Sequence, residues 1–132
     1  MKLQMLIVAD YAAADIGSGK LTVVGAFNII YAQQFPAIHP RLAIAVKLAS
    51  DNPLETTEPR QFELHLTSED GIDLFQAATP VQIPRDEKGN RHDANVILEI
   101  NTLEFPSAGF YEFAIFIDGE KLGDTSIELV QL

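Results

Sequence analysis

The chain has 132 residues, no cysteine and a formal net charge of −10 at pH 7. A chain of this length is expected to form one domain, residues 1–132, whose core is large enough to be stable without disulfides. The lack of cysteine excludes a disulfide framework, cysteine-ligated zinc and a thiol nucleophile, and it fits a reducing cytoplasm. With only 9 Lys and Arg, we expect no binding to nucleic acid phosphates or to anionic membranes.

The N-terminal stretch MKLQMLIVADYAAAD has the outline of a secretion signal, with a positive charge, an apolar run and small residues. Its apolar run, residues 5–9, is shorter than a usual signal core and is ended by Asp10. We therefore expect a first β-strand here. No stretch approaches the roughly 20 apolar residues of a membrane-spanning helix.

Apolar and polar residues alternate along most of the chain, and β-branched and aromatic side chains are frequent, which is typical of half-buried β-strands. Eight strands are predicted, over residues 2–11, 20–31, 41–49, 60–67, 72–83, 93–103, 109–118 and 121–131. The pair Asp118-Gly119 predicts a hairpin between the last two, because a type I′ turn needs positive φ at both central positions. The polar segments 50–59 and 84–92 are expected to be loops.

No long amphipathic helix is indicated, and the strands are short and separated by turns. This combination predicts an all-β, single-domain antiparallel β-sandwich of about eight strands, with a closed β-barrel as the alternative. In the third strand, Leu42, Ile44, Val46 and Leu48 are expected to face the core. The strand order does not follow from this pattern.

The second predicted strand is apolar on both faces, with Phe27 and Ile29 on one side and Val24 on the other. One face of a simple two-layer sandwich meets water, so this is unusual. The third strand likewise places Ala43 and Ala45 on its outer face. These outer faces are expected to be buried either against a second subunit or against a long loop of the same chain.

Two Phe-Pro pairs, at residues 35–36 and 105–106, are expected to lie at the same end of the sandwich. One interpretation is that their side chains plug the gap between the sheets. The other is an exposed apolar patch that binds a partner or a small ligand. The candidate partner-binding residues are Tyr31, Phe35, Ile38, His39 and Phe105, together with Val24.

Acidic loops are expected to gather at the opposite end of the sandwich, which suggests a calcium site as an alternative function. Its candidate ligands are Asp15, Asp51, Asp86 and Asp118. Basic residues in the same loops compete for these carboxylates, and no EF-hand spacing is present. Solvated polar loops are the other interpretation.

An enzyme with His39 or His65 as its base is the third alternative, although no second catalytic group can be named. The third histidine, His92, lies in a charged loop. The stretch DIGSGKLT superficially resembles a phosphate-binding loop, but its glycine spacing is wrong and Lys20 opens a β-patterned run. No catalytic residue, metal or cofactor is therefore assigned.

Two stretches of the chain, LIVADYAAADIGSGKLTVVGAFNIIYAQQFPAIHPRLAIAVKL and AGFYEFAIFIDGEKLG, resemble a small bacterial family of domains of unknown function. The resemblance implies a compact β-sandwich and transfers no catalytic residue. Together with the composition, it leads us to expect a non-catalytic, cytoplasmic binding or assembly module. Its predicted partner is a second copy of itself, forming a homo-oligomer, or an unknown protein.

Overall fold

The computed structural model describes residues 1–50, 58–85, 88–89 and 92–132. These residues form nine β-strands: β1 (Lys2–Ala14), β2 (Leu21–Ala26), β3 (Ile29–Ala32), β4 (Ala37–Ala49), β5 (Arg60–Ser68), β6 (Asp73–Val81), β7 (Ala94–Phe105), β8 (Gly109–Ile117) and β9 (Glu120–Gln131). Within the described ranges, no helix has the length and apolar character of a membrane span.

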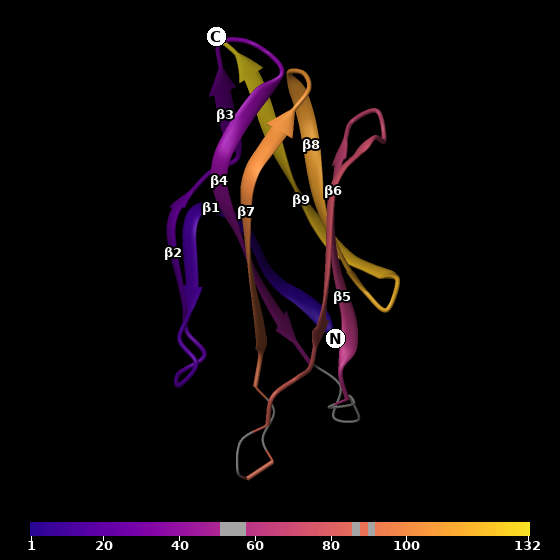
Figure 1. The fold of residues 1–132 in the computed structure, drawn as a ribbon. Coiled ribbons are helices and arrows are strands. Elements are labelled where there is room, and N and C mark those ends of the chain that lie inside the picture. The colour runs from indigo at the N-terminus through magenta and orange to yellow at the C-terminus, as the bar shows by residue number, and fades with distance from the viewer. Residues whose placement is uncertain (51–57, 86–87, 90–91) are drawn as a thin grey trace.

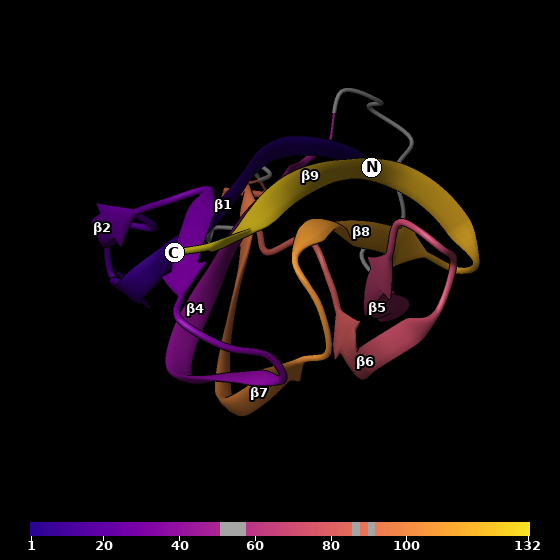
Figure 2. The same ribbon diagram turned by 90° about the horizontal axis from the view of Figure 1, so that it is seen from above.

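The strands form two facing sheets, which confirms the predicted sandwich (Figure 1). The first sheet has the order β2-β1-β4-β7, and the second has the order β3-β9-β8-β5-β6. Seen from above, the second sheet curves beside the first (Figure 2). The end strands of the described sheets do not pair with one another, so the barrel alternative is wrong.

The core lies between the two sheets and is built from the alternate side chains of each strand. The predicted inward set of β4, residues 42, 44, 46 and 48, is fully buried. On the opposite sheet Phe62 and Leu64 of β5 and Phe113 and Ile115 of β8 meet it, also fully buried. Period-two burial of apolar side chains thus drives the chain into two layers that each hide one face.

The prediction of one strand over residues 20–31 is wrong, because the chain breaks at Phe27 and Asn28 and changes sheets. Gly25, just before the break, has a φ of 69°, and the carboxylate of Asp10 occupies the place where a Cβ would lie. Only glycine tolerates that backbone at such close approach. The strand count is therefore nine, and β3 pairs with β9 in parallel, unlike every other strand pair described.

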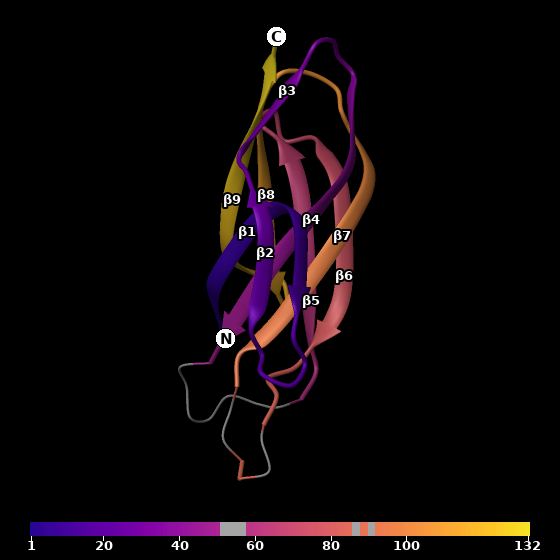
Figure 3. The same cartoon turned by 90° about the vertical axis from the view of Figure 1, so that its left-hand side faces the viewer.

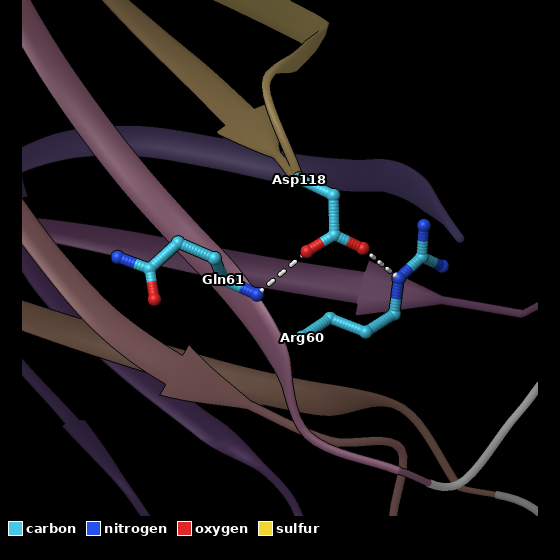
Figure 4. Close-up of polar contacts among 3 residues, drawn as sticks. All are labelled: Arg60, Gln61 and Asp118. Atoms are coloured by element: carbon cyan, nitrogen blue, oxygen red, sulfur yellow. Dashed lines mark hydrogen bonds and ion pairs between the residues drawn. The ribbon is translucent and has the colours of Figure 1, made fainter.

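The hairpin between β8 and β9 has the predicted turn, with φ of 49° at Asp118 and 82° at Gly119. The carboxylate of Asp118 also anchors the turn to β5 (Figure 4). Asp118 Oδ2 accepts from Arg60 Nε at 2.8 Å, and Oδ1 accepts from the Gln61 amide at 2.9 Å. The Arg60 hydrogen bond and the Gln61 amide hold the pKa of this carboxyl below its ordinary value.

Candidate functional site: the uncharged flank of β2 and β3

The second half of β1 leaves its sheet and folds back over it. Residues 2–9 of β1 pair with β4, whereas residues 9–14 pair with β2. At the tip of the β1–β2 hairpin, the Gly19 carbonyl accepts from Lys47 Nζ of β4 at 3.3 Å and from Asn95 Nδ2 of β7 at 2.9 Å. The hairpin therefore lies on the outer face of β4 and β7, as a third layer (Figure 3).

Small side chains make this close approach possible. Ala12 of the hairpin joins Ala43 and Ala45 of β4 in a buried cluster, against which Val23 of β2 packs. Ala45 is fully buried although its side chain points away from the main core. The outer face of β4, expected to need a second subunit or a long segment of the chain, is thus covered by the chain's own hairpin.

The opposite face of the hairpin remains open to solvent. Tyr11 of β1 and Val24 of β2 are directly opposite one another in the ladder, and both are exposed, Val24 by 53%. Cross-strand pairs of this kind form a continuous apolar surface. One face of β2 therefore serves folding, and the other is free for contact.

The apolar surface continues onto β3 through a groove. Ile29 and Tyr31 are exposed on alternate positions of β3, Tyr31 by 60%. The groove beside them is lined by both residues and by Phe27, His39 and Asp10. The ring of His39 lies against that of Phe27, with centroids 5.7 Å apart. We call the surface of residues 21–32, with Tyr11, the β2–β3 flank.

Charge is absent from this part of the chain. Between Lys20 and Arg41, no Asp, Glu, Lys or Arg occurs, although 21% of all residues are charged and the net charge is −10. Asp10 lies at the edge of the groove, and Glu128 of β9 is the ladder partner of Ile29, so carboxylates border the flank. A neutral, apolar strip on a strongly acidic surface is a feature that marks contact sites.

The segment that follows the flank turns into the core. Phe105 is fully buried and meets Tyr111 edge to face, with ring centroids 5.0 Å apart. Phe35 is partly buried and packs against the same core, and Ala37 pairs with Phe105 in the ladder. Ile38, in contrast, is 62% exposed. Of the candidate contact residues, Phe35 and Phe105 therefore plug the sandwich end, and the others face outward at least in part.

Residues 4–130 match DUF6941, a family of unknown function. The chain belongs to this family. No curated protein matches it. Among solved structures, the Pseudomonas fluorescens alkylpurine DNA glycosylase AlkC, bound to DNA containing an abasic site analog, matches with 16% sequence identity and a TM-score of 0.49. That match covers 97% of this chain and 30% of the glycosylase, so the chain spans under a third of that protein's length.

In this DUF6941 domain, His65 and His39 each lie against an aromatic ring. His65 stacks on Phe116 with centroids 4.6 Å apart, and its Nε2 lies 3.6 Å from a carboxylate oxygen of Glu63. His39 packs on Phe27 at the groove. Neither ring is accompanied by a nucleophile among its described contacts, so no catalytic group is added to the candidates named from the sequence.

Two of the calcium candidates, Asp15 and Asp118, already bond within the chain. Asp15 Oδ2 accepts from the amide of Ser18 at 2.8 Å and from its hydroxyl at 2.6 Å, and these bonds lower the pKa of Asp15. Asp51 and Asp86 lie outside the described residues. In the part of the chain that the structure describes, no three His, Asp or Glu side chains are grouped to hold a metal.

A hollow of about 800 Å³ lies between the hairpin tip, the end of β6 and the start of β7. Two of its charged lining residues are engaged in local bonds. Asp15 binds Ser18, and Arg85 Nη1 donates to the Gly89 carbonyl at 3.0 Å.

Val24 and Tyr31, both exposed, were named from the sequence as candidate contact residues, whereas Tyr11 and Ile29, which extend the same exposed flank, were not. Tyr11 was missed because its place beside Val24 depends on the β1–β2 pairing. A signal was nevertheless present, since the gap in charge from residue 21 to residue 40 is visible in the sequence. Charge patterning along an acidic chain would have outlined the flank without a structure.

Proposed function

We propose that this DUF6941 domain is a non-catalytic binding or assembly module that self-associates through the β2–β3 flank. The observation that carries the proposal is the exposed apolar surface of Tyr11, Val24, Ile29 and Tyr31 on a stretch without charge. Burying one large apolar side chain stabilises a complex by about 1.5–3 kcal/mol before the cost of association. Several adjacent side chains are a sufficient source of affinity.

Electrostatics supports the same surface. Two copies that each carry a net charge of −10 repel one another wherever their acidic faces meet. Contact through the neutral flank keeps these faces apart. Salt screens the remaining repulsion, so self-association is expected to strengthen as ionic strength rises.

A reducing cytoplasm is the compartment that best suits the module, because the chain has no cysteine to be oxidised. The resemblance of the sequence to a small bacterial family of domains supports a bacterial source.

The proposal is tested by measuring solution mass by light scattering over a wide range of protein concentration. We expect the wild-type mass to exceed that of the 14.5 kDa monomer as concentration rises. Val24→Asp and Tyr31→Asp should shift the chain to monomer. Ile72→Asp is the matched control, because Ile72 is a similarly exposed apolar residue, at 61%, outside the flank.

A wild-type chain that remains monomeric at the highest concentration would refute self-association. Phe35→Asp is not a suitable probe, because Phe35 packs against the core and its loss would disturb the fold.

A further inference from the structure

The described sheets end in four open strands, which differ in how they are protected against pairing. In the second sheet, β6 carries Asp73 and Pro80, and β3 is only four residues long. In the first sheet, β7 carries Glu99 and Glu104. Charges, prolines and short length are the usual devices that prevent an open strand from recruiting another.

The remaining edge, β2, lacks the protection that charge and proline give. Its six residues, Leu21–Ala26, include no charge and no proline. Gly25 bends the backbone near its end and leaves the stretch from Leu21 to Val24 as the regular part of the strand. Among the described strands, β2 pairs with β1 alone.

The ladder shows which backbone groups of β2 face outward. The Asp15 amide donates to the Lys20 carbonyl at 2.9 Å, which makes residues 15 and 20 a hydrogen-bonded pair. Bonded and non-bonded pairs alternate in an antiparallel ladder. Thr22 and Val24 therefore direct their amides and carbonyls to β1, while those of Leu21 and Val23 point to the open edge.

We propose that two copies of the chain pair antiparallel along β2 about a two-fold axis, joining two four-stranded sheets into one of eight strands. This inference rests on the proposed self-association and specifies its interface. An antiparallel pair of identical strands is self-complementary, so a single closed dimer satisfies the open β2 edge of each copy. With the axis at Val23, whose amide and carbonyl face the open edge, Thr22 of one copy lies opposite Val24 of the other, and each of these side chains lies diagonal to its own counterpart.

The charge pattern favours a second copy as the occupant of this edge. A strand added to β2 finds no charged side chain with which to pair its own charges, and β2 is itself an uncharged strand. Like charges placed opposite one another on a sheet are destabilising, and a neutral strand meets none. If another neutral peptide were the occupant of this edge, the wild-type chain alone would stay monomeric in the test below.

The third layer holds β2 in place for this pairing. Val23 packs into the alanine cluster on β4, and the Gly19 carbonyl at the hairpin tip is held by Lys47 and Asn95. A strand that is already fixed loses little conformational freedom when a partner pairs with it. The fold thus presents a preorganised edge.

A charge-swap experiment tests the inference. Val24→Glu and Val24→Lys are made separately, and dimer formation is measured by sedimentation for each alone and for an equimolar mixture. Each variant alone should weaken the dimer by at least about tenfold in Kd, because the two identical charges lie diagonal to one another across the axis, within reach of long side chains. The mixture should recover dimer, because Glu of one copy then lies diagonal to Lys of the other.

Ile72→Glu and Ile72→Lys form the control pair and should leave the wild-type Kd unchanged, alone and mixed. Thr22→Glu and Thr22→Lys repeat the test at the neighbouring exposed position, in case a Val24 variant disturbs the hairpin. If the wild type dimerises and neither Val24 nor Thr22 variants weaken it, pairing along β2 is overturned while self-association stands. Weakening without recovery in either mixture also overturns the pairing, and a monomeric wild type overturns both proposals.

Discussion

The uncharged segment of residues 21–40 has two halves, of which one is exposed to solvent and the other packs against the core. Its first half, over β2 and β3, leaves Val24 and Tyr31 exposed to solvent by 53% and 60%. Its second half places Phe35 against the core, beside the fully buried Phe105. The same lack of charge therefore accompanies an exposed surface in one half and core closure in the other.

The difference follows from where each half pairs. β2 and β3 pair on one side only, with β1 and β9 respectively, so their other edges stay open. The second half enters β4, where Ala37 lies opposite Phe105 of β7 and the adjoining aromatic rings turn between the sheets. An apolar composition favours burial of a segment. The way its strands pair determines whether other parts of the same chain bury it.

The largest effect is expected at the plugged end. Phe105→Ala should lower the free energy of unfolding by about 3–5 kcal/mol, because it removes a fully buried ring and leaves a cavity. Val24→Ala should change it by less than about 0.5 kcal/mol when measured at a concentration where the chain is monomeric. Urea unfolding measures both. A loss below about 1 kcal/mol for Phe105→Ala would remove the distinction between the two halves.

The third layer is tested by overfilling it. Ala45→Leu should cost about 1–3 kcal/mol in urea unfolding, because the added methyl and methylene groups must displace the hairpin that covers β4. Ala78→Leu is the control, since Ala78 is an exposed alanine on β6. Equal and negligible effects at the two positions would mean that the outer face of β4 is open.

A smaller effect is expected from the polar contact behind Phe105. The Tyr111 hydroxyl donates to the Ser107 carbonyl at 2.6 Å and tethers the β7–β8 turn to the core. Tyr111→Phe keeps the ring and removes this bond, so we expect a loss of about 0.5–1.5 kcal/mol. Thermal unfolding at a fixed concentration measures it, and an unchanged melting temperature would exclude the hydroxyl from the account of this end.

The smallest effect is expected in the pH dependence of stability, and it comes from Asp118. Arg60 holds the pKa of Asp118 below its value in the unfolded chain, so the folded state binds this proton less readily. The resulting stabilisation is present above the unfolded pKa of about 3.9 and is lost as pH falls through the folded pKa. The melting temperature of the wild type should therefore approach that of Asp118→Asn as pH falls from 6 to 2.5. A difference that is constant over this range would contradict the sign.

Much of this fold follows from local pattern. Alternation correctly placed Leu42 and Ile44 in the core, and Asp118-Gly119 correctly predicted its turn, since both depend on neighbours in sequence. The fold-back of β1 could not be predicted, because no glycine or proline marks the change of direction near Ala9. The change of sheet after Gly25 was missed for a related reason, as the apolar residues continue on both sides of the break.

The candidate site was predicted in part. Val24 was named because a strand apolar on both faces needs two covers. Tyr31 was named because it lies in the apolar segment that leads to the Phe-Pro pair at residues 35–36, and both arguments are local. The face of β2 that the same chain buries is the one that packs on Ala45 through the hairpin. This is a tertiary contact, and no local sequence pattern indicates it. The uncharged stretch was the remaining signal, and it marks the segment without separating its two halves.

Amide hydrogen exchange along β2, measured at a low and a high protein concentration, tests the central claim most directly. The account predicts that the amides of Leu21 and Val23, which face the open edge, exchange quickly at low concentration and become protected at high concentration. The amides of Thr22 and Val24, already bonded to β1, should change little. Exchange of Leu21 and Val23 that does not depend on concentration, where light scattering detects a dimer, would contradict pairing along β2.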